Sequence, residues 1–354
     1  MIRVLVVDDS AFMRKVLSDV FASEPDFTVV DTARNGQDAF EKIKKHKPDV
    51  VTMDVEMPIM DGITALEKIM AESPVPIIMV SSLTRDGANA TIRALELGAV
   101  DFIAKASGPI SSVSGIQSEL IAKCRAVAKS NFRQFSAPRT KLISPIPLAI
   151  PKKNSVNFSP SPTTEQIVAI GTSTGGPRAL QEVLTKLPGN LPCGVIIVQH
   201  MPPGFTKSLS ERLNALCSLS VKEAEHNDII RPGLVLIAPG DYHIILEREA
   251  GKTLVKLNQN PPLGGHRPAV DPMMESVAAI YGKSALGVIL TGMGHDGAKG
   301  IQCIKQSQGY TIAEDQSTAV VFGMPKSAIE LNAVDKIVPL PLVAAEIVRI
   351  IMKQ

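Results

Sequence analysis

Short apolar runs alternate with amphipathic stretches along the first third of the chain. Each apolar run has the length of a buried strand, and each amphipathic stretch has the 3.6-residue period of a helix. Five such βα units with short connections predict an open parallel sheet that is covered by helices on both faces. The strands are predicted at 2–7, 50–53, 77–80 and 101–104, and the helices near 12–23, 37–45, 63–71, 88–97 and 115–128.

The last part of the chain shows the same alternation of apolar runs and helical stretches. Its apolar runs have the length of strands in a buried parallel sheet, and the segment 243–257 is typical of an antiparallel hairpin. We therefore predict a second three-layer α/β/α domain. Its strands are expected near 167–170, 195–199, 234–238, 286–291 and 310–313, with one helix at 177–187 and a terminal helix at 341–353.

A segment rich in proline and serine separates the two halves. Six prolines lie between 129 and 163, which prevents both a helix and a central strand. From Arg125 to Thr164 there are seven basic residues and no acidic residue. Such a segment either stays extended in solvent by self-repulsion or docks weakly on an acidic partner surface. The predicted organisation is a domain at 1–125, a flexible linker at 126–163 and a domain at 164–354.

A glycine-rich turn at 171–176 joins a predicted strand to a predicted helix, and Ser173 lies inside this turn. Glycines permit a sharp turn that exposes a serine hydroxyl above a sheet, and the helix N-terminus behind it favours negative charge. The same kind of turn also cradles phosphate groups. The turn alone therefore indicates either a nucleophile or a phosphate site.

His200 and Asp296 lie just past the ends of two further predicted strands. Because the carboxyl ends of parallel strands meet at one edge of a sheet, we expect both residues to lie near Ser173. A serine nucleophile needs a neutral imidazole as base, and the imidazole needs a carboxylate to fix its tautomer. The three residue types match these roles. Their chain order, Ser-His-Asp, differs from the Ser-Asp-His order of α/β-hydrolases and disfavours that fold.

The predicted strands of the first domain also end in polar residues. Asp8 and Asp9 follow one strand, and Asp54 follows another. Carboxylates at one place repel each other unless a cation lies among them, and hard oxygen ligands suit Mg²⁺. Ser81 and Lys105 end two other strands and would offer a hydroxyl and a positive charge to an added phosphoryl group. The sequence therefore predicts a site for Mg²⁺ and a phosphoryl group.

These motifs resemble those of two known families. Residues 1 to about 125 are similar to a response-regulator receiver domain, through the acidic pair 8–9, the phosphoacceptor pattern 54–62, the serines 81–82 and Lys105. Residues from about 165 onward resemble the catalytic domain of the CheB family of chemotaxis protein-glutamate methylesterases. The matching stretches are 171–176, 199–205, 238–241, 266–268, 290–297 and 321–325.

The resemblance implies a role for each candidate site residue. In the catalytic domain it makes Ser173 the nucleophile, His200 the base and Asp296 the acid that orients the base. Met293 would contribute its backbone N–H to the oxyanion hole. The implied receiver residues are the phosphorylated Asp54, the supporting Asp8, Ser81 and Lys105, and the Mg²⁺ ligands Asp9, Asp54 and the Glu56 backbone carbonyl. The implied fold is a flavodoxin-like receiver and a doubly wound, Rossmann-like catalytic domain, with no cofactor for ester hydrolysis.

The implied function is a phosphorylation-activated serine hydrolase that demethylates glutamate methyl esters and deamidates glutamines on chemoreceptors, for adaptation in bacterial chemotaxis. Its partners would be methyl-accepting chemoreceptors and a chemotaxis histidine kinase. Two other classes stay open from the residues themselves, a receiver fused to a nucleotide-binding domain and a non-catalytic scaffold. The nucleotide-binding class lacks the Gly-Lys-Ser/Thr ending and the acidic residue at dinucleotide-site spacing.

Two positions depart from the family patterns. Ala106 stands where receiver domains usually have proline after the lysine, so the geometry of that loop is open. His295 stands where the CheB family often has asparagine, and as the immediate neighbour of Asp296 it is poorly placed to pair with that carboxylate. Other polar residues near the active edge have simpler interpretations: His243 and His266 as structural histidines, and Glu314 with Asp315 as a solvated turn.

Composition narrows the remaining possibilities. The net charge of +2 and the absence of Trp give no general attraction to nucleic acid or to a membrane surface. The four cysteines have no C-x-x-C spacing, which is typical of reduced thiols in the cytosol. No apolar run reaches the ~18 residues of a membrane span, and no leader pattern opens the chain. We therefore expect a soluble cytoplasmic protein.

Overall fold

The computed structural model describes residues 1–105, 113–130 and 165–352. The chain divides into two compact units, Met1–Thr140 and Lys141–Gln354, and each is described by itself. Most of the predicted linker, 126–163, lies outside the described residues, as does Ala106. The extended linker and the domain boundaries therefore stay predictions. Across the described part of the chain, every helix is too short or too polar to span a membrane.

The first unit is built on a five-stranded parallel sheet with the order β2-β1-β3-β4-β5. This order is that of the predicted flavodoxin-like fold. The strands are β1 (Ile2–Val7), β2 (Phe27–Ala33), β3 (Val50–Asp54), β4 (Ile77–Ser81) and β5 (Asp101–Ala104). The helices are α1 (Ala11–Ala22), α2 (Gly36–His46), α3 (Gly62–Glu72), α4 (Arg85–Leu97) and α5 (Val113–Ala128).

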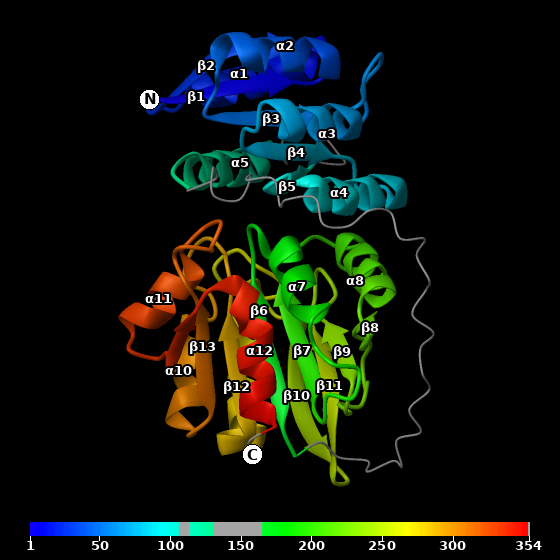
Figure 1. Cartoon of the computed structure of the whole chain (residues 1–354), viewed down its shortest axis with the longest axis vertical. Helices are drawn as coiled ribbons and strands as arrows, with labels where there is room; N and C mark the ends of the chain where they lie inside the picture. Colours follow the sequence, from blue (N-terminus) through cyan, green and yellow to red (C-terminus); the bar gives the residue numbers. More distant parts are fainter. Residues whose placement is uncertain (106–112, 131–164, 353–354) are drawn as a thin grey trace. The chain divides into compact units, whose positions relative to one another are not determined.

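Handedness explains how these helices cover both faces. The connection from β1 to β2 runs one way along the sheet and the later connections run the other way, so right-handed crossovers place α1 opposite α2, α3 and α4. The latter three pack in a row, α2 against α3 and α3 against α4 (Figure 1). Four of the helices begin at polar N-caps that accept a hydrogen bond from the N–H three residues on. These caps are Ser10, Asn35, Asp61 and Thr84.

The second unit has a seven-stranded parallel sheet with the order β14-β13-β12-β6-β7-β9-β8. Its strands are β6 (Ile167–Thr172), β7 (Gly194–Gln199), β8 (Ser220–Glu223), β9 (Leu234–Ile237), β12 (Ala285–Ile289), β13 (Tyr310–Glu314) and β14 (Lys336–Val338). A separate antiparallel hairpin joins β10 (His243–Glu249) to β11 (Lys252–Asn258). The helices are α7 (Gly176–Leu184), α8 (Phe205–Leu216), α9 (Val270–Tyr281), α10 (Ala298–Gln306), α11 (Met324–Glu330) and α12 (Leu340–Ile351).

The chain enters this sheet at its centre. From β6 it passes to β7, then to the edge strand β8 and back to β9, which lies between β7 and β8. It later returns to β12 and continues the other way to β13 and β14 (Figure 1). The strand order therefore reverses beside β6, and such a reversal is where ligands bind in doubly wound sheets. Both predicted three-layer folds and the predicted hairpin are confirmed.

Two strands escaped the sequence analysis because they lie at the sheet edges. β8 and β14 form the two ends of the sheet, and several of their side chains are exposed. An edge strand has no continuous apolar run, so hydrophobic patterning does not reveal it. By contrast, β6, β7 and β12 are buried along their whole length. They form the rigid centre from which the candidate site residues project.

Candidate active site and acidic cluster

Ser173 is the first residue beyond β6, and its backbone is held on both sides. Its N–H donates to the Thr291 carbonyl at 3.0 Å, and its carbonyl accepts from the Gly176 N–H at 2.7 Å and from Gln199 Nε2 at 3.0 Å. The turn then reaches α7 through Gly175, which has a φ of +79° that favours glycine. The predicted strand-turn-helix junction is therefore present, with the serine next to a helix N-terminus.

The loop that follows β12 lies directly against this serine. A Cβ added to Gly292 would be 2.9 Å from the Ser173 Cβ and 2.1 Å from Met324 Sδ, so only glycine fits. Gly292 also donates to the Val321 carbonyl, while its own carbonyl accepts from Met324 N. The next residue, Met293, is half-buried, and its backbone N–H has no hydrogen-bond acceptor among the described residues. That N–H is available to an acceptor, one residue beyond the contact between Gly292 and Ser173.

His200 and Asp296 form a direct pair. His200 Nε2 lies 2.7 Å from Asp296 Oδ2, and the Asp296 carboxylate also accepts from the N–H groups of Val270 and Asp271 at the start of α9. Burial raises the pKa of Asp296, but the hydrogen bonds from His200 and from these amides outweigh it and hold the pKa below its usual range. The carboxylate is thus charged and fixed in place.

Because Asp296 pairs with Nε2 of His200, Nδ1 is the ring nitrogen that remains available to accept a proton. Nδ1 is buried and has no hydrogen-bond partner in the described structure, and Ser173 Oγ makes no hydrogen bond to His200 there. Both residues nevertheless stand at neighbouring strand ends, and the His200 N–H donates to the Thr172 carbonyl. In a serine-protease triad the carboxylate pairs with Nδ1 of the histidine, and Nε2 faces the serine. Here the carboxylate pairs with Nε2 and leaves Nδ1 for the serine, which is the opposite arrangement.

The other histidines occupy different surroundings. His266 stacks on His200 with ring centroids 3.9 Å apart and an interplanar angle of 7°. His243 is buried, accepts from the Ala269 N–H and lies 3.2 Å from the Pro261 carbonyl, as expected of a structural histidine. His295 is exposed and makes no contact with Asp296 that the described structure records.

Glu314, the last residue of β13, was wrongly interpreted as part of a solvated turn. It is fully buried, and its Oε2 accepts from the Thr291 N–H at 2.8 Å. Its Oε1 accepts no hydrogen bond in the described structure. Burial raises the pKa of Glu314 to about 7, against the lowering effects of the Thr291 N–H and the nearby Thr318 hydroxyl. The sequence contained a signal for Glu314, because it ends an apolar strand in the same way as the other candidate residues lie at or just past strand ends.

The ionisation of Glu314 gives a prediction for stability. A carboxyl whose pKa rises from 4.5 unfolded to about 7 folded destabilises the fold progressively over that pH range. The full penalty, up to about 3 kcal/mol, applies above pH 7 and disappears below pH 4.5. We expect Glu314→Gln to melt with wild type at about pH 5 and several degrees higher at about pH 8.5. Thermal denaturation at both pH values checks this, and equal melting temperatures at pH 8.5 would contradict it.

The first unit carries the predicted acidic cluster. One oxygen from each of Asp8, Asp9 and Asp54 lies within 4.8 Å of the others. Asp8 and Asp54 are buried, and Lys105 Nζ lies 2.7 Å from Asp54 and 3.3 Å from Asp8. Burial raises the pKa of both buried carboxyls more than Lys105 lowers it. Asp8 Oδ2 is buried, and the contact recorded for it is the Lys105 ammonium at 3.3 Å, so it is a carboxylate oxygen that interacts with positive charge.

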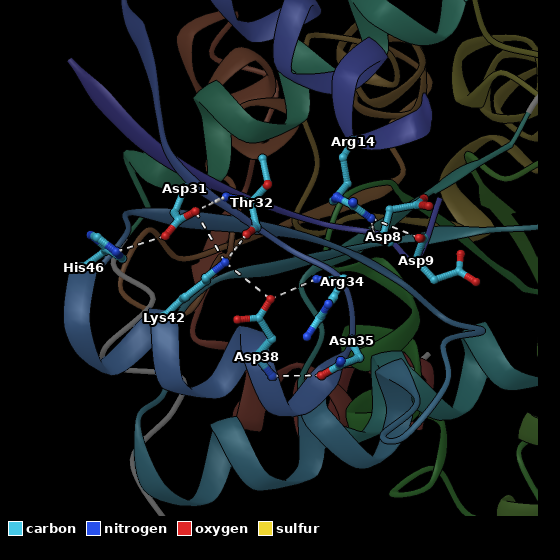
Figure 2. A network of polar contacts seen from close by, with 10 residues as sticks. All are labelled: Asp8, Asp9, Arg14, Asp31, Thr32, Arg34, Asn35, Asp38, Lys42 and His46. Atoms are coloured by element: carbon cyan, nitrogen blue, oxygen red, sulfur yellow. Dashed lines mark hydrogen bonds and ion pairs between the residues drawn. The ribbon is translucent and has the colours of Figure 1, made fainter. Parts of the chain in front are cut away.

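Arg14 fixes the backbone of the acidic loop. Its Nη1 donates to the carbonyls of Asp8 and Asp9, both at 2.9 Å (Figure 2). The same view shows Lys42 between Asp31 and Asp38, with Nζ 3.4 and 3.3 Å from their carboxylates. These neighbouring acids are paired with Lys42 within the fold. The acidic cluster differs from them because it brings three carboxylate oxygens within 4.8 Å of one another, an arrangement that fits Mg²⁺.

Two further predicted receiver residues are placed as follows. Ser81 is fully buried, and its hydroxyl donates to the Gly87 carbonyl in the first turn of α4 at 3.1 Å. Its carbonyl accepts from the Lys105 N–H at 2.7 Å, which ties the ends of β4 and β5 together. Glu56 is exposed in the loop that follows Asp54. Lys105 therefore lies against Asp54, while Ser81 ends the strand next to β3 and contacts α4.

Comparisons with known proteins agree with this arrangement. Residues 168–347 match the family described as CheB methylesterase, and residues 4–114 match the response regulator receiver domain. A protein-glutamate methylesterase/protein-glutamine glutaminase of Pyrococcus abyssi is 48% identical, over 98% of this chain and 93% of its own. One of Halalkalibacterium halodurans is 50% identical, over 98% of each chain.

The second unit also has a solved structural relative. The crystal structure of the Thermotoga maritima CheB methylesterase catalytic domain is 46% identical, with a TM-score of 0.52. It covers 52% of this chain and 98% of its own. The relatives are enzymes by name, which favours hydrolysis over the nucleotide-binding and scaffold alternatives.

Proposed function

Because the chain belongs to the CheB family and is a protein-glutamate methylesterase and protein-glutamine glutaminase with a receiver domain, we propose that Ser173 carries out the hydrolysis and that phosphorylation of Asp54 activates it. The observation that carries the first part is the His200–Asp296 pair beside the serine turn. The acidic cluster with Lys105 carries the second.

The proposed reaction follows from the contacts of each residue. Ser173 Oγ attacks the γ-carbonyl of a glutamate methyl ester while His200 Nδ1 takes its proton. Asp296 holds the ring through Nε2 and stabilises the imidazolium. The oxyanion accepts from the Met293 N–H next to the N-terminus of α7. His200 then returns the proton to the departing methanol.

The second half of the reaction releases the enzyme. Water attacks the Ser173 ester while His200 takes a proton from it. The bond between the acyl carbon and Ser173 Oγ then breaks, His200 gives its proton to this oxygen, and the released glutamic acid side chain loses its proton to solvent. A glutamine substrate follows the same route, with ammonia as the leaving group. Both activities therefore use one site.

The substrates and the switch complete the proposal. The methyl esters lie on the cytoplasmic helical bundle of methyl-accepting chemoreceptors, and the enzyme works in the cytoplasm during chemotactic adaptation. A chemotaxis histidine kinase supplies the phosphoryl group. Asp9, Asp54 and the Glu56 backbone carbonyl would hold Mg²⁺, with Asp8 assisting, and this ion neutralises phosphoryl charge when bound. Lys105 forms an ion pair with the modified Asp54.

Release of methanol tests the activity directly. Full-length enzyme and membranes that carry methyl-labelled chemoreceptors should release labelled methanol, and a phosphodonor with Mg²⁺ should increase the rate. Absence of release from receptors that are shown to be methylated would contradict the proposed substrate.

Activation gives a further prediction about the two domains. If the unphosphorylated receiver restrains the catalytic domain, a fragment that begins near Thr164 should be more active than the resting full chain and indifferent to a phosphodonor. Activation of ~10-fold requires a difference of only about 1.4 kcal/mol between the restrained and released states. Initial rates of the fragment, the resting chain and the phosphorylated chain on one receptor preparation check this. A fragment at or below the resting rate would instead indicate that the phosphorylated receiver stimulates the catalytic domain.

A further inference from the structure

We propose that Glu314 is a positioning residue for the reaction at Ser173, which holds the Thr291 loop against the serine turn and does so fully only as a carboxylate. This inference rests on the proposed role of Ser173. It adds a pH-sensitive component that lies behind the catalytic residues.

The contact between Glu314 and Thr291 links two neighbouring strands. Glu314 ends β13, and Thr291 follows β12, which pairs with β13 in parallel register. The 2.8 Å bond from the Thr291 N–H to Glu314 Oε2 is buried. An amide N–H buried without an acceptor is costly, so the position of Thr291 depends on this carboxyl.

Thr291 in turn connects the parts of the active site. Its carbonyl accepts from the Ser173 N–H at 3.0 Å and from the Thr172 hydroxyl at 2.9 Å. Its own hydroxyl donates to the Thr174 carbonyl at 2.9 Å and accepts from the Val321 N–H at 3.0 Å. The serine turn is thus bound to Thr291 through residues 172, 173 and 174. A shift of Thr291 moves the backbone that carries the nucleophile.

The same loop carries the oxyanion donor. Met293 is two residues beyond Thr291, and the intervening Gly292 fits tightly between Ser173 and Met324. Gly292 is enclosed by Ser173 on one side and Met324 on the other, so a displacement of Thr291 is passed on to this contact. The distance between the Ser173 hydroxyl and the Met293 N–H therefore depends on how firmly Glu314 holds Thr291.

The surroundings of Glu314 leave its charge uncompensated. Within residues 1–105, 113–130 and 165–352, the one charged group that acts on it is the neighbouring Asp315, which opposes ionisation. Thr318 Oγ1 lies nearby but donates to the Asp315 carbonyl at 3.3 Å. On the adjacent β14, Lys336 pairs with Glu346 of α12 at 2.9 Å. Burial without a cation raises the pKa of Glu314 to about 7, so both forms are populated near neutral pH.

The two forms differ as hydrogen-bond acceptors. A carboxylate accepts a hydrogen bond from an N–H more strongly than a neutral carboxylic acid does. If this difference in hydrogen-bond strength is expressed in the transition state, it corresponds to roughly a tenfold difference in rate. Met293 gains its full acceptor only when the oxyanion forms, so the effect falls on kcat and leaves KM unchanged. His200 is present in every variant compared below, so its contribution cancels when the variants are compared as ratios.

The test compares full-length wild type, Glu314→Gln and Asp315→Asn over about pH 5.5 to 8.5, with kcat and KM for methanol release from methyl-labelled receptors. Glutamine has the shape of the protonated acid at every pH. The ratio of wild-type to Glu314→Gln kcat should rise from about 1 at pH 5.5 to roughly 10 at pH 8.5, with a midpoint near 7. The Asp315→Asn ratio should be near 1 at both ends of the range and dip slightly below 1 near the midpoint, because Asp315 opposes the ionisation of Glu314. A Glu314→Gln ratio that does not change with pH would overturn the proposal, because a purely structural defect acts at every pH.

Two further comparisons keep the result decisive. If Glu314→Gln fails to fold, Glu314→Asp replaces it, because the shorter side chain cannot keep the 2.8 Å bond and its deficit should also grow with pH. A deficit of equal size at all pH values would again overturn the proposal. Ser173→Ala is measured in parallel. If Ser173→Ala stays active, the proposed function itself fails; if it is inactive and the ratio is flat, only the role of Glu314 fails.

Discussion

Ser173→Ala is expected to lower turnover of glutamate methyl esters by roughly 10⁴-fold or more while the protein folds normally. The variant loses the atom that forms the acyl-enzyme in the proposed mechanism, but the turn is held by the backbone bonds of Ser173 to Thr291, Gly176 and Gln199, which alanine retains. His200→Ala should be comparably impaired and Asp296→Asn somewhat less. Methanol release from labelled receptors measures the effect.

Ser218→Ala is the matched control for this experiment. Ser218 is an exposed serine of the same domain, just before β8, and its replacement should leave turnover unchanged. Circular dichroism and thermal denaturation establish that both variants are folded. If folded Ser173→Ala kept a tenth of wild-type activity, the serine mechanism would be wrong.

Asp54→Asn is expected to abolish both uptake of the phosphoryl group and activation by a phosphodonor. The amide cannot form the acyl phosphate, and it replaces one of the three carboxylates that fit Mg²⁺. Incubation with a labelled small-molecule phosphodonor and Mg²⁺ measures uptake, and methanol release before and after measures activation. The resting rate should not fall, because the active site is in the other unit.

Asp61→Asn controls for a change of charge in the same loop. Asp61 caps α3 by accepting from the Thr64 N–H, and asparagine can do the same. This variant should be phosphorylated and activated as wild type is. Labelling and stimulation of Asp54→Asn at the wild-type level would show that another residue is the acceptor.

Strand ends explain why much of the site could be predicted from the sequence. Ser173 and His200 each follow a continuous apolar run. Such a run predicts a central strand of a parallel sheet, and both runs are strands that are buried along their whole length. The parallel sheet then brings the ends together without any information on loops. For the same reason Asp8 and Asp54 were placed together with Lys105.

Other features depend on tertiary contacts that no local pattern contains. Glu314 ends an apolar strand too, but whether a carboxyl there faces solvent or an amide of the next strand depends on the β12–β13 register. The choice of Nε2 for Asp296 depends on where α9 begins, since its first amides fix the carboxylate. The stacking of His266 on His200 joins two loops that lie far apart along the chain.

The hydrogen bonds that hold Ser173 in place do not involve its hydroxyl. All of the recorded hydrogen bonds of Ser173 are made by its backbone N–H and carbonyl. The turn therefore fixes the position of this residue without using its side chain. A substitution at position 173 can thus keep these backbone contacts while it removes the hydroxyl. The backbone of the turn determines where residue 173 lies, and its side-chain oxygen determines whether the proposed hydrolysis can take place there.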